Sequence, residues 1–290
     1  MKLKIKSFIA LVLISTINLR AYANPEIKIY PESVKQGEQI FIELDTNESE
    51  QKLDNLLVEI NDKYFPLINI GNHYKCFIAI SPELKVGEYS VKILNQQKET
   101  IALKTINVTL TKTGSQNISY SSPILTKAQK EIIKQEDQLV EKAKFTFSEK
   151  QLWNKPFVLP VPHKVTALYG IKRYLNGKYN GYHTGVDFAS PMGYAVKAIN
   201  NGNIILAEYF SKYNSNGNLI YVDHGLGVGS VYLHLSKIVV KQGEYVKQGQ
   251  IIGYIGSSGR STGPHIHWGV YLNGQNTDGL GWTKLTNKLF

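Results

Sequence analysis

Hydrophobic and polar residues alternate in short runs along the chain between residues 24 and 113. Alternation of this kind is typical of β-strands that bury one face, and turn residues separate the runs. Short strands at regular spacing predict a small antiparallel β-sandwich of immunoglobulin-like form over residues 24–113. The only cysteine, Cys76, falls inside one run, so we expect a buried thiol and no disulfide. The expected strands are Ile27–Tyr30, Ile40–Leu44, Tyr74–Ile80, Tyr89–Leu94 and Ile106–Leu110.

The charged segment that follows has the pattern of a helix. Thr126 and Gln129 match a capping box, in which each side chain accepts a hydrogen bond from the other residue's backbone N–H. A partial apolar stripe continues from there. We expect residues 114–153 to form a linker, with a loop at Ser115–Ser122 and a helix at about 126–144 that packs along one domain. The stripe consists of Ala128, Ile132, Leu139, Val140 and Ala143.

The composition changes after about residue 154. Twenty of the 24 glycines lie between Gly170 and Gly281. Glycine at this density between apolar, β-rich runs indicates tight turns and bulges rather than helices. We therefore expect residues 154–290 to form a compact antiparallel β domain, which makes the whole chain mainly β. Its expected strands are Ala195–Leu206, Leu219–Val222, Ser230–Leu235, Ile251–Ile255 and His265–Leu272.

The first 23 residues have the pattern of a secretory signal peptide. Three lysines precede the apolar run Phe8–Leu19, and Ala21-Tyr22-Ala23 supplies small residues at a cleavage site. The run is too short to favour a permanent membrane span, and we expect no span after its removal. Four of the ten net positive charges belong to residues 1–23, which leaves about +6. A modest positive charge on an exported chain favours anionic cell-wall polymers over nucleic acid as the partner.

Histidines concentrate in the C-terminal half, where five of the seven lie between His183 and His267. Histidine and carboxylate are the usual ligands of a catalytic zinc ion, which keeps three protein ligands and one position for water. His265 and His267 are two residues apart on one expected strand, so their side chains share a face and their α-carbons lie about 7 Å apart. In an extended strand His183 and Asp187 would lie about 13 Å apart, so a shared metal requires a bend between them.

Gly185 lies midway between His183 and Asp187 and makes such a bend inexpensive. Each pair alone is an ordinary pattern on a surface strand. Their confinement to one glycine-rich domain, together with His234 in Tyr232-Leu233-His234-Leu235, favours a metal centre over a set of unrelated structural histidines.

From about Phe157 to Gly279 the sequence resembles the lysostaphin-type (LytM-type) zinc endopeptidases, which cut peptides of bacterial peptidoglycan. The resemblance implies the family's antiparallel β fold, a duplicated hybrid motif. It also implies one Zn²⁺ ion per chain, bound by His183, Asp187 and His267. The matching stretches are Phe157–Val161, Tyr182–Phe188, Pro191–Ala198, Val222–Gly225, Tyr232–Leu235 and Gly259–Trp268.

Through the same resemblance, His265 and His234 are expected to act on the attacking water and the transition state. The sequence leaves the division between them open. His224 is expected to be structural. Tyr179 and Tyr182 lie near the motif, but neither falls at the position of the tyrosine that assists in some relatives, so that role also stays open.

The resemblance implies hydrolysis of peptidoglycan peptide cross-links in the periplasm, with secretion or wall association as the alternative. The bond is a D-alanine–diaminopimelate link or a glycine bridge, and the domain plan favours the first. A second candidate function is a non-catalytic or latent scaffold that activates other wall hydrolases, although such relatives lack metal ligands. The N-terminal domain is also a candidate intramolecular inhibitor. A hairpin at Val239–Gly253 resembles biotinyl and lipoyl carriers but lacks their lysine site.

Overall fold

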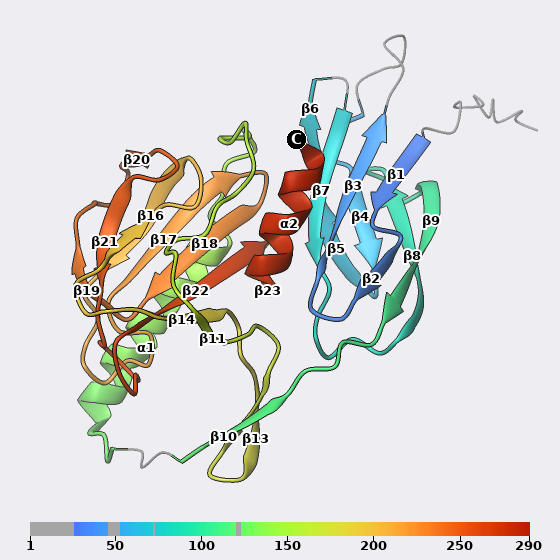
Figure 1. Cartoon of the computed structure of the whole chain (residues 1–290). Helices are drawn as coiled ribbons and strands as arrows, with labels where there is room; N and C mark the ends of the chain where they lie inside the picture. The colour runs from blue at the N-terminus through green and yellow to red at the C-terminus, as the bar shows by residue number, and fades with distance from the viewer. Residues whose placement is uncertain (1–25, 46–52, 72, 120–122) are drawn as a thin grey trace, which may run out of the picture.

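The computed structural model describes residues 26–45, 53–71, 73–119 and 123–290, and the predicted signal peptide lies outside them. Within these ranges the chain is mainly β, as the sequence predicts. Two β-rich parts are joined by a strand and a helix (Figure 1). No helix in the described part of the chain has the length and apolar character needed to cross a membrane.

The N-terminal part consists of two sheets that enclose one hydrophobic core. All five strands expected here are present; β9 begins six residues earlier than expected, and the other ends shift by at most two residues. The buried Cys76 side chain belongs to this core, as predicted. In sheet order, the first sheet is β1 (Glu26–Tyr30), β3 (Gln39–Asp45), β7 (His73–Ala79) and β6 (Ile68–Ile70). The second is β2 (Ser33–Lys35), β9 (Thr100–Thr109), β8 (Gly87–Leu94), β4 (Leu57–Ile60) and β5 (Lys63–Pro66).

The connector begins with a strand where the sequence predicted a loop. Strand β10 (Ser115–Ile118) pairs in parallel with β12 (Lys172–Leu175), which in turn pairs with β13 (Lys178–Tyr182). The loop prediction was wrong for Ser115–Ile118. This segment carries no recognisable strand pattern, because its residues are mostly exposed and do not alternate between apolar and polar. A partner more than 50 residues away in the chain satisfies its backbone.

Helix α1 (Lys127–Lys144) then follows, with the predicted capping box formed by Thr126 and Gln129. Its last turns pack against the outer face of the C-terminal sheet, where Val140 and Ala143 join Leu206 and Tyr221 in a small core. The predicted helix and its packing along one domain are therefore confirmed.

The C-terminal part contains a large antiparallel sheet and a smaller three-stranded one. In sheet order, the large sheet is β11 (Val165–Ala167), β14 (Val186–Ala189), β22 (His265–Leu272), β18 (Val228–Leu233), β17 (Leu219–Gly225), β16 (Gly202–Glu208) and β20 (Tyr245–Val246), with β23 (Gln275–Thr277) paired to β22. The small sheet is β15 (Ala195–Lys197), β21 (Ile251–Ile255) and β19 (Leu235–Ile238).

Two of the expected strands are interrupted. The run Ala195–Leu206 divides into β15 and β16 because the buried Asn200 side chain turns the chain, donating to the Lys155 carbonyl and accepting from the Asn201 N–H. The run Ser230–Leu235 divides at His234, whose φ of 64° is incompatible with a strand.

The chain ends in a helix, α2 (Gly279–Leu289), that the all-β expectation missed. Its first residues are Gly279, Leu280 and Gly281, which resemble a turn. Gly279 is needed because a Cβ there would lie 2.8 Å from the Trp268 ring. The Asp278 side chain caps the helix by accepting from the Leu280 N–H.

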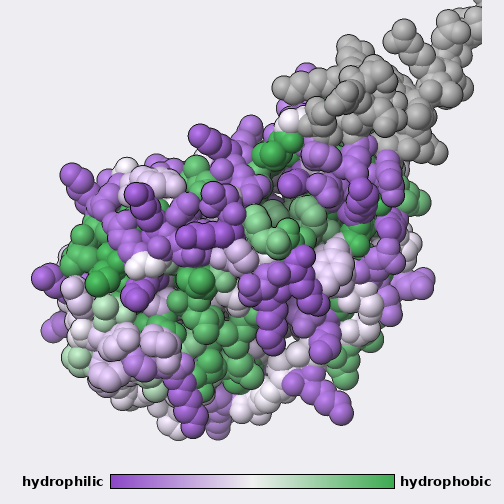
Figure 2. Space-filling model, turned by 45° about the horizontal axis from the view of Figure 1, so that its top comes forward, coloured by the Kyte–Doolittle hydropathy of each residue, from purple (hydrophilic) through white to green (hydrophobic). Residues whose placement is uncertain are grey.

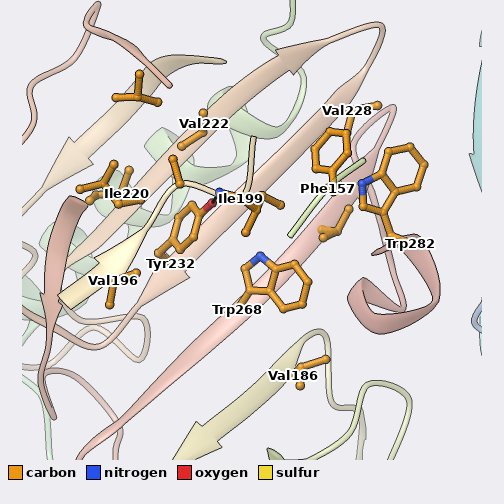
Figure 3. Close-up of a cluster of buried hydrophobic side chains, with 14 of the residues drawn as sticks. Phe157, Val186, Val196, Ile199, Ile220, Val222, Val228, Tyr232, Trp268 and Trp282 are labelled. Carbon is orange, nitrogen blue, oxygen red and sulfur yellow. Dashed lines mark hydrogen bonds between the residues drawn. The ribbon is translucent and has the colours of Figure 1, made fainter. Parts of the chain in front are cut away.

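Helix α2 lies between the two β-rich parts (Figure 1). Its Trp282 is fully buried and packs against Trp153, Phe157 and Phe77, of which Phe77 comes from β7 of the N-terminal sandwich. Figure 3 shows Trp282 beside Phe157, with Trp268 and Val186 below them in the same core. The two parts therefore share one core rather than touching through a polar surface.

The face of the molecule shown in Figure 2 is hydrophilic over most of its area, with smaller hydrophobic areas between the polar side chains. Large apolar side chains that are more than half exposed occur on both parts, for example Leu103 and Leu110 on the first and Met192 and Tyr209 on the second.

Candidate metal centre

Strand pairing brings two of the predicted ligands face to face. Strands β14 and β22 are antiparallel neighbours, and their register sets Asp187 opposite His267. His183 precedes β14 and is almost fully buried at 1% exposure. Its Nε2 atom lies 3.0 Å from Asp187 Oδ1 and 3.0 Å from His267 Nδ1, and the last two atoms are 2.8 Å apart. The structure thus brings all three predicted ligands together.

The bend that the sequence analysis required lies at Gly185. Glycine is needed there because of space rather than backbone angle, since Gly185 is not among the glycines with positive φ. A Cβ at this position would lie 2.5 Å from the Trp268 carbonyl oxygen and 2.6 Å from His267 Nε2. The predicted bend is confirmed, and the glycine also makes room for the His267 ring.

The three converging atoms fit a bound cation. The His183 Nδ1–H donates to the Leu168 carbonyl at 2.8 Å, which leaves a lone pair on Nε2. That lone pair points at a carboxylate oxygen and at another imidazole nitrogen, and a cation relieves the resulting repulsion. Tetrahedral zinc binds nitrogen and oxygen at about 2.0–2.2 Å, which separates ligand atoms by roughly 3.4 Å. A few tenths of an ångström of expansion would accommodate it.

The charge states of the ligands suit metal binding. Burial alone would raise the pKa of Asp187, but its interactions with the His183 and His267 rings outweigh the effect of burial and hold that pKa well below its usual range. Burial lowers the pKa of His267, against the opposing effect of Asp187. The carboxylate is therefore ionised and His267 is neutral near pH 7, which are the forms that bind metals.

The other two predicted histidines form a pair beside these ligands. The rings of His234 and His265 lie 4.6 Å apart, and the His234 ring lies 6.2 Å from that of His267. The Nδ1 atoms of both are turned to backbone carbonyls at 2.8 Å, of Ser258 for His234 and of Gly263 for His265. Their Nε2 atoms are therefore available to a substrate or a water.

The electrostatic setting of His234 keeps it neutral. Burial, together with the nearby His265 and His267, lowers the pKa of His234 to about 3. With its proton on Nδ1, a neutral His234 carries a lone pair on Nε2, so at neutral pH it accepts a hydrogen bond there rather than donating one.

The remaining histidines and tyrosines take other roles. His224 is fully buried, with Nδ1 2.7 Å from the Asn201 carbonyl and Nε2 2.8 Å from the Ser230 hydroxyl, which agrees with a structural residue. Tyr179 donates to Glu83 of the N-terminal sandwich, and Tyr182 donates to Asn276. Both tyrosine hydroxyls therefore have partners outside the ligand cluster.

A second group of potential ligands lies on the N-terminal sandwich, where Glu43, Asp45 and His73 approach one another. Lys28 forms an ion pair with Asp45, and Lys75 forms one with Glu43 at 3.9 Å. These lysines already balance the carboxylates, so the group does not require a cation.

The sequence analysis missed Arg173 on β12. One of its terminal nitrogens lies 3.3 Å from Asp187 Oδ2, and its side chain is 25% exposed. Its Nε atom is buried without a hydrogen-bond partner. An arginine ten residues before His183 gives no signal by itself, because the contact depends on the pairing of β12 with β13.

Three ligand atoms in a buried cluster, with two unligated histidines beside them, form a candidate metallohydrolase centre. The comparisons with known proteins agree: residues 181–279 match peptidase family M23. The chain is 41% identical to the crystallised catalytic domain of the antimicrobial peptidase lysostaphin from Staphylococcus simulans. That alignment covers 42% of this chain and 92% of that one, with a TM-score of 0.37. The chain therefore contains a peptidase family M23 domain over residues 181–279.

Two further relatives extend the comparison. The peptidoglycan DD-endopeptidase ShyB of Vibrio cholerae is 39% identical over 98 residues, which are 34% of this chain and 22% of ShyB. The matched segment thus spans about a fifth of that relative's length. The crystal structure of a putative peptidase M23 from Pseudomonas aeruginosa is similar over 86% of this chain and 93% of its own, at 25% identity and a TM-score of 0.62. The similarity to this last structure extends over both β-rich parts.

Proposed function

We propose that this chain is a zinc-dependent endopeptidase that hydrolyses peptide cross-links of bacterial peptidoglycan. The observation that carries the proposal is the convergence of His183 Nε2, Asp187 Oδ1 and His267 Nδ1 within 3.0 Å of one another. These three residues would hold one Zn²⁺ ion. When bound, the ion supplies a Lewis acid that polarises a carbonyl and makes water acidic enough to lose a proton near pH 7.

The two remaining histidines supply and support the proton transfers. His265 lies on the same strand and face as His267, and its Nε2 is free because Nδ1 donates to Gly263. It accepts the proton of the attacking water and passes it to the leaving amine. His234 starts neutral, with a lone pair on Nε2. It stays neutral, because burial and the nearby His265 and His267 lower its pKa to about 3. Its Nε2 therefore accepts a hydrogen bond, from the attacking water or from the neighbouring His265 ring while that ring holds the proton, and so helps to orient both.

The substrate assignment rests on the relatives. ShyB is named for DD-endopeptidase action on peptidoglycan, and it is 39% identical to this chain over 98 residues. The segment that matches family M23, residues 181–279, holds the candidate ligands. Together with the predicted signal peptide, this favours an exported enzyme that cuts direct D-alanine–diaminopimelate cross-links in the periplasm. The glycine bridge, which the family resemblance also allows, is the alternative bond to test.

The contacts of the candidate site bear on whether the N-terminal part could make the enzyme latent. Among the described residues, the hydrogen bonds and ring contacts of the five candidate site residues all stay within the C-terminal part. Inhibition by the N-terminal part thus remains a prediction. It is better tested by full-length variants than by truncation before residue 154, which would remove Phe77 from the shared core.

The test is mass spectrometry of muropeptides released from purified wall of both cross-link types. Wild type should release monomers from directly cross-linked wall. His267→Ala should lose both zinc and activity, whereas His265→Ala should keep zinc and lose about 10²–10⁴-fold in rate. His73→Ala removes a histidine from the second cluster and should change nothing. Undiminished release by His267→Ala would refute the zinc mechanism, and zinc binding without release by wild type would favour the scaffold function.

A further inference from the structure

The two oxygens of Asp187 have separate partners. Oδ1 lies 3.0 Å from His183 Nε2 and 2.8 Å from His267 Nδ1, whereas Oδ2 lies 3.3 Å from a terminal nitrogen of Arg173. The carboxylate side chain is only 13% exposed, so water has little access to either oxygen. An ionised carboxylate can bind a metal through one oxygen or through both. Here the arginine lies on the side of the second oxygen.

Arg173 places a positive charge beside a site that would bind a metal cation, and this arrangement requires a physical explanation. A guanidinium stays charged in proteins, so Arg173 is a cation at neutral pH. Its charge repels any metal bound by the neighbouring histidines. Such a residue is stabilising only if its attraction to Asp187 exceeds that repulsion. Its place on Oδ2, away from the two histidine nitrogens, satisfies this condition.

The backbone of Arg173 is paired with the connector strand. Strand β12 lies between β10 and β13, and Gln116 of β10 is the register partner of Arg173. On the other side the pairing with β13 is irregular between Lys172 and Tyr174, so Arg173 has no register partner there. The Nε atom is buried and has no hydrogen-bond partner, so packing and the contact with Asp187, rather than a bond at Nε, restrict the side chain. The connector strand thus contributes to the geometry at Asp187, although it lies far from the ligands in the sequence.

We propose that Arg173 is a positioning residue that holds Asp187 by Oδ2, so that only Oδ1 is presented to the metal. The proposal rests on the proposed function in one respect, namely that His183, Asp187 and His267 bind a metal. Without Arg173 the carboxylate is free to rotate and to bind through both oxygens. The coordination number then rises, and the open position for water becomes crowded. Outer partners of ligands typically contribute 10–100-fold in metal affinity or activity.

The test uses the full-length protein and two metals. Zinc affinity is measured by competition with a chromophoric chelator, and the visible spectrum of the cobalt(II) form reports coordination number, because four-coordinate cobalt absorbs far more strongly than six-coordinate cobalt. Arg173→Met should weaken zinc binding by about 10–100-fold and reduce the cobalt absorption. Arg173→Lys should recover part of both. Lys172→Met removes the same charge from the adjacent, exposed position of β12 and should match wild type.

Two results would overturn the proposal. One is wild-type zinc affinity and an unchanged cobalt spectrum in Arg173→Met. The other, which decides the matter if Arg173→Met fails to fold, is an Arg173→Lys protein that melts like wild type without metal and shows no change in zinc affinity or cobalt absorption. Failure of the proposed function is distinguishable from both, because wild type itself would then bind no zinc at His183, Asp187 and His267.

Discussion

Gly185→Ala tests whether the space beside the metal ligands is as tight as the structure shows. The added Cβ would lie 2.5 Å from the Trp268 carbonyl oxygen and 2.6 Å from His267 Nε2, where ordinary contact begins at 3.4 Å. Both contacts must therefore open, by 0.9 Å and 0.8 Å. The Trp268 backbone is held in β22 between β14 and β18, so residue 185 itself must move away from that carbonyl. The His267 ring is the side chain that must give way at the other contact.

The displacement is large compared with what a metal tolerates. Ligand distances in metal sites hold to about 0.2 Å, so a shift of 0.8 Å in His267 takes its Nδ1 out of reach. We expect a loss of at least about 100-fold in zinc affinity, and a fall of about 1–3 kcal/mol in the unfolding free energy of the metal-free protein from overpacking.

Chelator competition measures the affinity, and urea unfolding of the metal-free protein measures the stability. Gly114→Ala is the matched control, because its Cβ meets nothing within 4 Å and its φ is not positive. The control should alter stability by less than about 1 kcal/mol and leave zinc binding unchanged. Wild-type zinc affinity in Gly185→Ala would show that the close approach of Gly185 and His267 is not part of the site.

Two further predictions concern the framework. Phe77 is 2% exposed and packs on Trp153 and Trp282, so Phe77→Ala should lower the unfolding free energy by about 3–5 kcal/mol in urea titrations, and a loss below 1 kcal/mol would contradict a shared core. Burial lowers the pKa of His224 to about 4 from an ordinary 6.5. The contribution of neutral His224 to the unfolding free energy is therefore complete above pH 6.5, and about 3 kcal/mol of it is lost as the pH falls toward 4. Unfolding measured at pH 7 and pH 4.5 should therefore show a smaller difference in His224→Gln than in wild type, and equal differences would refute this account.

Much of the fold follows from local patterns. The run His265–Leu272 was predicted with the same bounds that β22 has, because its apolar residues leave little alternative to a buried strand. The capping box at Thr126 was predicted for a similar reason, since its hydrogen bonds join residues three apart. Where the required partners are near in sequence, the sequence was sufficient.

The features that were not predicted depend on partners that are distant in the sequence. Strand β10 has a polar sequence and becomes a strand only through β12. Helix α2 begins with two glycines and forms because Trp282 completes a core built from both β-rich parts. The contact between Arg173 and Asp187 likewise depends on tertiary pairing. In the candidate site, residue type and spacing indicated a metal centre in the histidine-rich segment, and the family resemblance selected His183, Asp187 and His267 as the expected ligands. Neither pointed to the arginine beside them.

The central claim is that one zinc ion bound by His183, Asp187 and His267 is required to cut a peptidoglycan cross-link. It is tested most directly by stripping the full-length protein of metal and adding zinc back in steps, while cleavage of a purified, directly cross-linked muropeptide dimer is followed by mass spectrometry. The account predicts no cleavage without zinc, and a rate that rises linearly and levels off at one equivalent per chain. Cleavage by the stripped protein at the full rate, or none at any zinc level with either cross-link type, would contradict it.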